Sequence, residues 1–163
     1  MDGRSYQSTV MSDSTMKVEE TYDISAPFFG YTHVAHWVEH ALPKRVRSKD
    51  LEEYLNTATI DKPRPFMFKV SGAIDQATIH IVNLPKGTTV RSPDEAHQGL
   101  KKYQLRNEQV DILGFFSTEH KAVFTHHDTF VHMHLITKDQ SKMGHLDDIK
   151  FKRGAMKLEL PWR

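Results

Sequence analysis

A chain of 163 residues is long enough to bury roughly 70% of the surface that its unfolded form exposes, so one domain over residues 1–163 is predicted. Its 22 Lys and Arg side chains balance 21 Asp and Glu side chains, which leaves no electrostatic footprint for a nucleic acid or an anionic membrane. The absence of Cys excludes disulfides and thiolate ligands, so a metal ion would be held by imidazole and carboxylate groups.

The first part of the chain predicts strands followed by a short helix. Residues 4–10 are polar with Tyr, Thr and Val, which predicts an edge strand or an extended entry segment. Residues 27–43 carry bulky side chains at both alternating and helical spacing, and the aromatic residues of their first half favour a strand. Ser48 then caps a short amphipathic helix, which is predicted for residues 48–58.

Two strands and a second helix are predicted for the middle of the chain. Residues 64–72 and 77–85 alternate between apolar and polar side chains and are joined by the tetrapeptide AIDQ. They are therefore expected to form an antiparallel pair. Pro93 suits the first turn of a helix, and the second helix is predicted for residues 93–103.

The last third of the chain is rich in predicted strands. They cover residues 109–117, 121–126, 129–137, 145–151 and 155–162. Two short helices among some seven or eight strands indicate an α+β domain built on a curved mixed, mostly antiparallel sheet or a small barrel. The apolar runs are far shorter than the roughly 20 residues that span a bilayer, and the N-terminal residues lack the pattern of a signal peptide.

The strongest chemical signal is a group of three histidines. His132 and His134 stand two residues apart in an alternating segment, so both imidazoles project from the same face of a strand. A polar turn follows, and His145 begins the returning strand, which brings its side chain back toward the first two. Three imidazoles leave one coordination position open, as in catalytic zinc sites. The three histidines are therefore predicted to bind Zn²⁺.

A second group of polar residues directly precedes these ligands. His126, His127 and Asp128 have two interpretations of equal weight. They are suited to fixing the tautomers of the ligand histidines, and they equally fit a polar strand edge without function.

A competing zinc motif lies earlier in the chain. His36, Glu39 and His40 match the H-x-x-E-H pattern of inverted zinc peptidases. That chemistry requires a helix that carries both histidines one turn apart. Gly30 and Pro43 leave little room for such a helix, so the three-histidine site is preferred.

The residues around the three histidines resemble a known family. FVHMHLITKDQSKMGHLDD is similar to the zinc-binding segment of acetolactate decarboxylases, in which H-x-H is followed by a polar turn and a Gly-Gly-His step. Here Met143-Gly144-His145 stands at that step. ILGFFS, RPFMFKVSGAIDQATIHIV and DGRSYQS are similar to further family segments, so weak similarity covers most of the chain.

The resemblance implies a zinc-dependent decarboxylation of 2-acetolactate, a small hydroxy-keto acid, to acetoin and carbon dioxide. Zinc acts there as a Lewis acid that stabilises the enediolate, which an arginine and carboxylates help to protonate. His80 occupies the position that matches the arginine, and it is predicted as the catalytic proton donor. One family glutamate falls before Met1 and another falls in a C-terminal extension, so an N-terminally truncated chain is expected.

Two further functions stay open beside the decarboxylase. The first is a zinc-dependent ester hydrolase on a related fold, which needs only an acidic water on the metal. The second is a catalytically degenerate metal-binding protein. A cytoplasmic location is expected, with export as the alternative if a segment precedes Met1, and a homodimer stays open as the assembly.

Overall fold

The computed structural model is built mainly from antiparallel strands. The structure describes residues 1, 3–24, 30–43, 46–85, 87–91, 95, 99–119 and 129–162. Its elements are β1 (Tyr6–Val10), β2 (Met16–Glu20), β3 (Val38–Ala41), the 3₁₀ turn η1 (Ser48–Asp50), α1 (Leu51–Ala58), β4 (Phe66–Val82), β5 (Leu100–Arg106), β6 (Gln109–Phe116), β7 (Val131–Thr137) and β8 (Met143–Leu160).

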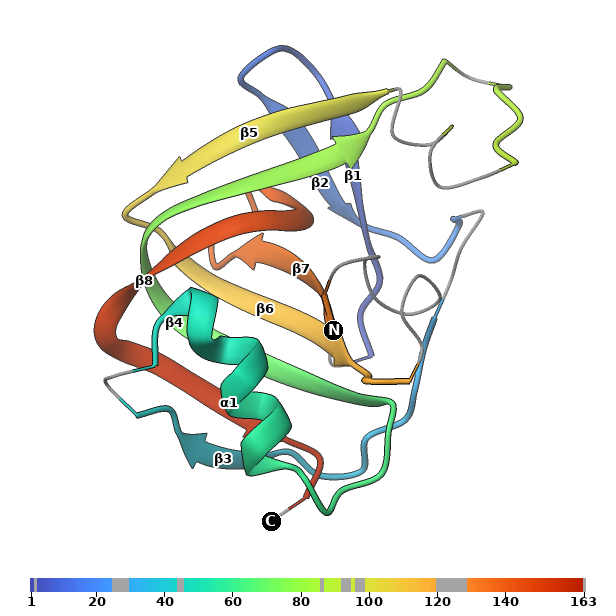
Figure 1. The fold of residues 1–163 in the computed structure, drawn as a ribbon. Helices are drawn as coiled ribbons and strands as arrows, with labels where there is room; N and C mark the ends of the chain where they lie inside the picture. The colour runs from blue at the N-terminus through green and yellow to red at the C-terminus, as the bar shows by residue number, and fades with distance from the viewer. Residues whose placement is uncertain are drawn as a thin grey trace.

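Six of these strands form one strongly curved sheet in the order β3-β8-β7-β6-β4-β5 (Figure 1). Its recorded pairings are antiparallel, and β8 pairs with β4 as well as with β7, so the sheet curves back on itself. Strands β1 and β2 form a separate hairpin. The predicted α+β class with a curved, mostly antiparallel sheet is confirmed, and over the described residues this sheet is not a closed barrel.

Strand β4 pairs with three other strands and is longer than the sequence predicts. The prediction of two paired strands over residues 64–72 and 77–85 is wrong, because Phe66–Val82 is a single strand. Its first half pairs with β6 and its second half with β5, while β8 runs along the other edge. The tetrapeptide AIDQ contains two register shifts and buries Ile74 in the core, so it bends the strand without reversing it.

Strand β8 shows the same departure from the sequence prediction. Residues 145–151 and 155–162 are predicted as two strands, but they belong to one strand, Met143–Leu160. Gly72 pairs with Met156 and Ile74 with Phe151, so β8 carries extra residues opposite β4 at this point. A bulge therefore interrupts the alternation at the place where the sequence suggests a break.

The structure also departs from the second predicted helix. The prediction of a helix over residues 93–103 is wrong from Leu100 onward, where the chain forms strand β5. Tyr103 and Leu105 alternate with exposed side chains and are buried, so pairing with β4 overrides the local helical signal. Other parts of the predicted elements lie outside the described residues: 27–29, 93–94, 96–98 and 121–126.

The first predicted helix is confirmed, with a different start. The 3₁₀ turn begins after Arg47, and α1 follows with Asp50 at its N-cap, so Ser48 is not the cap of the α-helix. Leu51 and Leu55 of α1 are buried in the core. Helix α1 lies against the curved sheet (Figure 1). A carboxylate oxygen of Glu52 accepts a hydrogen bond from the backbone N–H of Phe130 at 2.9 Å, which ties α1 to the start of β7.

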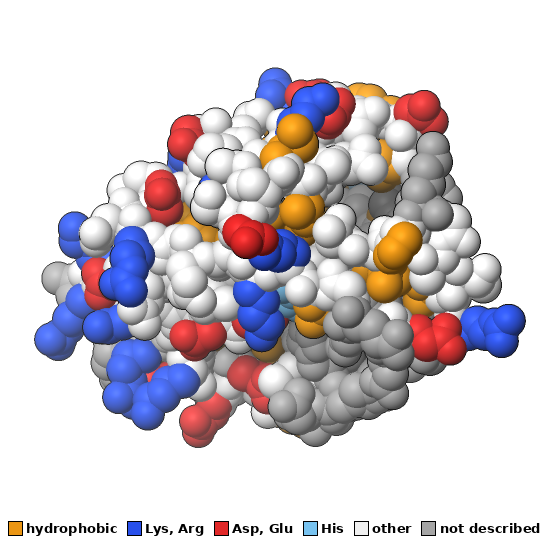
Figure 2. Space-filling model, turned by 90° about the horizontal axis from the view of Figure 1, so that it is seen from above, with side chains coloured by type: hydrophobic (Ala, Val, Ile, Leu, Met, Phe, Trp, Pro, Cys, Tyr) orange, Lys and Arg blue, Asp and Glu red, His pale blue; other side chains and the backbone are white. Residues whose placement is uncertain are grey.

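The surface agrees with the balanced charge of the sequence. Figure 2 shows one face of the molecule, on which cationic and anionic side chains lie among one another. Within the described residues, no helix is both long and apolar enough to cross a membrane.

Candidate metal centre

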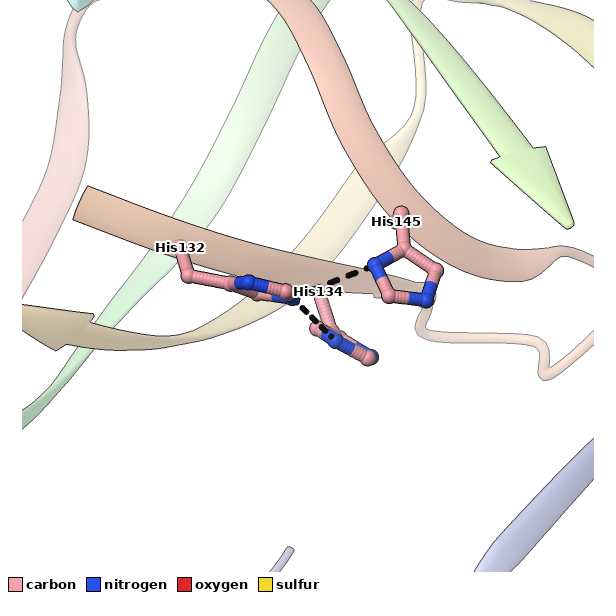
Figure 3. Close-up of side chains that lie close together, drawn as sticks. All are labelled: His132, His134 and His145. Carbon is pink, nitrogen blue, oxygen red and sulfur yellow. Dashed lines mark hydrogen bonds between the residues drawn. The ribbon is translucent and has the colours of Figure 1, made fainter. Parts of the chain in front are cut away.

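The hairpin of β7 and β8 brings the three predicted ligands together. His132 and His134 lie on one face of β7, and His145 of β8 is the direct cross-strand partner of His134. Directly opposed residues of an antiparallel pair point to the same face, so all three rings meet over one surface of the sheet. Figure 3 shows the rings turned toward a common point.

The nitrogens that face one another are Nε2 of His132, Nε2 of His134 and Nδ1 of His145. The Nε2 atoms of His132 and His134 are 2.9 Å apart, and His132 Nε2 lies 3.1 Å from His145 Nδ1. The ligand atoms of all three residues lie within 4.8 Å of one another. A tetrahedral ion with bonds of about 2.0–2.1 Å holds its ligand nitrogens roughly 3.3 Å apart, so the donor set and its spacing fit a metal ion.

The centre is open to solvent on one side. His134 is exposed, while His132 and His145 are half-buried. The cross-strand partners of His134 and His132 on β6 are Leu113 and Phe115, both half-buried, so apolar side chains flank the imidazoles on the same face. An apolar surface therefore borders the exposed imidazole.

The turn between β7 and β8 is fixed by its own polar contacts. The backbone N–H of Ser141 donates to Asp139 at 3.0 Å, and Gln140 adopts a positive φ of 58°. A hydrogen bond from the Thr137 side chain, followed by bonds from Ser141, lowers the pKa of the Asp139 carboxyl. These bonds stabilise the turn while Asp139 is ionised, and that stabilisation is lost as the pH falls through the lowered pKa.

His80 lies directly beside the three histidines. It is the cross-strand partner of His145 on the β4 side, and the two rings stack with a centroid distance of 5.0 Å and an interplanar angle of 4°. The His80 residue is only 5% exposed. Its Nδ1 lies 2.5 Å from an oxygen of Asp147, and the other oxygen of that carboxylate is 3.2 Å from Nζ of Lys102.

Gly144 allows β8 to approach β4 at this point. A methyl group on Gly144 would lie 2.6 Å from the backbone carbonyl oxygen of His80, which is too close for any real contact. The substitution Gly144→Ala is therefore expected to push the two strands apart, lower the free energy of unfolding by about 1–3 kcal/mol, and weaken binding of Zn²⁺ through His145. Urea denaturation and zinc titration measure the two effects.

Gly30 supplies a matched control for this substitution. Among the described residues, a methyl group there would meet the Phe115 ring at 3.5 Å, an ordinary contact distance. Gly30→Ala is expected to change both quantities little. Wild-type stability and wild-type zinc affinity in Gly144→Ala would contradict the close-approach argument.

The competing H-x-x-E-H motif does not form a metal site of the peptidase kind. Glu39 and His40 lie in strand β3, where successive side chains point to opposite faces, and His36 is exposed before the strand. Nε2 of His40 contacts the carbonyl oxygen of Trp162 at 3.0 Å, and Glu39 pairs with Lys157 at 3.1 Å. The required helix is absent from the described residues 30–43, of which only Val38–Ala41 is strand.

The family model described as alpha-acetolactate decarboxylase matches residues 1–161. The chain belongs to the alpha-acetolactate decarboxylase family. The resemblance that the histidine segment indicates is thereby confirmed, and the three histidines that could bind a metal ion lie in that segment. A comparison with curated proteins finds no match.

Solved structures of acetolactate decarboxylases share this fold. The enzyme from Bacillus subtilis subspecies spizizenii has a TM-score of 0.70 at 19% identity, and the match covers 97% of this chain and 65% of that one. The enzyme from Bacillus subtilis strain 168 has a TM-score of 0.67 at 17% identity, with 98% and 65% covered.

A third similar structure has no established function. It is a Staphylococcus aureus protein described as similar to alpha-acetolactate decarboxylase, with a TM-score of 0.73 at 14% identity, and the match covers 98% of this chain and 65% of that one. At these identities the likeness shows the fold. The present chain spans about 65% of the length of each of these three proteins.

Two residues beside the centre, Asp147 and Lys102, are not among the site residues predicted from the sequence. Asp147 stands two positions after His145, so an alternating strand would place it on the ligand face, and this signal could have found it. Lys102 gives no such signal, because only the pairing of β5 with β4 sets it opposite His80. His126, His127 and Asp128 lie outside the described residues.

Proposed function

We propose that the chain is a zinc-dependent carboxy-lyase that converts 2-acetolactate to acetoin and carbon dioxide. One observation supports this function above the others: three imidazole nitrogens converge on one point within the segment that resembles the family's zinc site. His132, His134 and His145 would hold the ion. When bound, Zn²⁺ supplies a Lewis acid that stabilises negative charge developing on substrate oxygens.

The chain's own residues suit a small anionic substrate. Three neutral imidazoles do not cancel the positive charge of a divalent ion, so the site keeps an attraction for the carboxylate of a hydroxy-keto acid. Leu113 and Phe115 place apolar surface beside the ligand histidines. A low local dielectric on that side strengthens the electrostatic interaction with the substrate.

The proton-donor role of His80 stays a prediction. His80 is close enough to the centre to act there, since its ring lies against that of His145. The stacking of its ring on His145 and the bond between its Nδ1 and Asp147 suit a residue that holds a neighbour in place. A proton donor is expected to affect turnover without changing the metal environment.

Acetoin release tests the proposed reaction. Protein loaded with one equivalent of Zn²⁺ is incubated with 2-acetolactate, and acetoin is measured against the uncatalysed background. We expect release that depends on the metal and is lost in His132→Ala. Cleavage of a simple aryl ester without acetoin release would instead support the hydrolase. Tight zinc binding without turnover of either compound would support the degenerate metal-binding protein.

A further inference from the structure

We propose that His80 and Asp147 are positioning residues of the metal centre. Asp147 holds the His80 ring, and the His80 ring in turn fixes the plane of the His145 imidazole. This inference rests on the proposed function, because it concerns how a ligand of that metal is aimed. It assigns roles to two side chains outside the three-histidine set.

The sheet arranges the participating residues in one row. Lys102 of β5 pairs with His80 of β4, His80 pairs with His145 of β8, and His145 pairs with His134 of β7. Directly opposed residues share a face, so the row runs from an exposed cation at one end to the predicted ligands at the other. A displacement of His80 is therefore passed to His145 across a single strand pairing.

A bulge in β8 places Asp147 beside this row. Thr78 pairs with Asp148 and Ile79 pairs with Leu146, so Asp147 is the extra residue that has no partner on β4. Bulges redirect a side chain relative to a regular ladder. Here the carboxylate spans Nδ1 of His80 and Nζ of Lys102.

The contact of His80 with His145 is suited to orientation. The outer torsion of a histidine side chain is broad, so the backbone of β8 alone does not set the ring plane of His145. The His80 ring lies parallel to it, at 4°, and a rotation of the His145 ring would drive its edge into His80. The ring therefore keeps its Nδ1 directed at His132.

The bond to Asp147 holds His80 in this position. A histidine that is 5% exposed needs a partner for its ring N–H, because an unpaired buried donor costs free energy. The Asp147 side chain is 24% exposed, and Lys102 balances its negative charge. Removing a group that orients a metal ligand but does not itself bind the metal typically lowers metal affinity by about 10- to 100-fold.

Cobalt binding tests this inference, since Co²⁺ reports ligand geometry through its visible absorption. His80→Ala removes the stacked ring, and His80→Phe restores a flat ring without the nitrogen atoms. We expect His80→Ala to lower Co²⁺ affinity about 10- to 100-fold and to alter the spectrum, and His80→Phe to recover most of the wild-type spectrum. Asp147→Asn keeps the shape of the side chain and is expected to lower Co²⁺ affinity to a smaller extent.

Asp148→Asn is the matched control, because Asp148 is the exposed neighbour that pairs with Thr78. It is expected to leave affinity and spectrum unchanged. Wild-type spectra and affinities in His80→Ala and Asp147→Asn would overturn the positioning role, and loss of acetoin release alone would then identify His80 as the proton donor. Absence of Co²⁺ binding by the unaltered protein would contradict the proposed function itself and this inference with it.

Discussion

The substitution His134→Ala is expected to lower the affinity of the protein for Zn²⁺ on the order of 100-fold or more. A direct ligand contributes more to metal affinity than a group that only orients a ligand. His134 supplies one of three convergent nitrogens, and its Nε2 lies 2.9 Å from Nε2 of His132. Two remaining imidazoles cannot complete a tetrahedral donor set. Because His134 is exposed, the loss of its ring should leave the fold intact, so the effect is on binding alone.

Zinc titration with a chromophoric chelator as competitor measures this loss. His36→Ala is the matched control, because His36 is also exposed and belongs to the competing H-x-x-E-H motif. We expect His36→Ala to bind zinc as the wild type does. Equal losses in the two variants would show that the ion is held elsewhere, and the reverse order would support the peptidase motif.

The largest effect on stability is expected for Gly72→Ala. Gly72 has a φ of 141°, which a residue with a side chain rarely adopts, and a methyl group there would lie 1.9 Å from the carbonyl oxygen of Ala155. Backbone strain and collision with β8 act together, so the free energy of unfolding should fall by about 3 kcal/mol or more. Urea denaturation, or failure to recover folded protein, measures this result.

Gly87→Ala separates the two causes. Gly87 also has a positive φ, at 88°, but a methyl group there would meet no atom of the described residues within 4 Å. Only the backbone strain applies, and a loss of about 1 kcal/mol is expected. A loss in Gly72→Ala no larger than that in Gly87→Ala would contradict the close packing of β4 against β8.

The ligand set could be predicted from the sequence because it depends on local structure. Alternation in β7 sets His132 and His134 on one face, and a short polar turn returns the chain so that His145 lies opposite His134. The alternation and the turn both lie within one continuous stretch of the sequence. The contacts that bring these nitrogens together need no information from distant parts of the chain.

The rest of the fold depends on pairing between distant segments. AIDQ in β4 and the residues near Gly154 in β8 look like turns in the sequence, but each is a bend within a long strand that the partner strand keeps extended. The local sequence favours a helix that runs into Leu100–Arg106. This segment nevertheless forms strand β5, because it pairs with β4. The contact between His80 and Asp147 likewise depends on the register of β4 with β8, which no local pattern specifies.

Crystals grown with Zn²⁺ and measured at the zinc absorption edge give the most direct test of the central claim. We predict an anomalous peak about 2.0–2.1 Å from three nitrogens, Nε2 of His132, Nε2 of His134 and Nδ1 of His145. A zinc-loaded crystal with no peak at this point, or with its peak beside His36 and His40, would contradict the account.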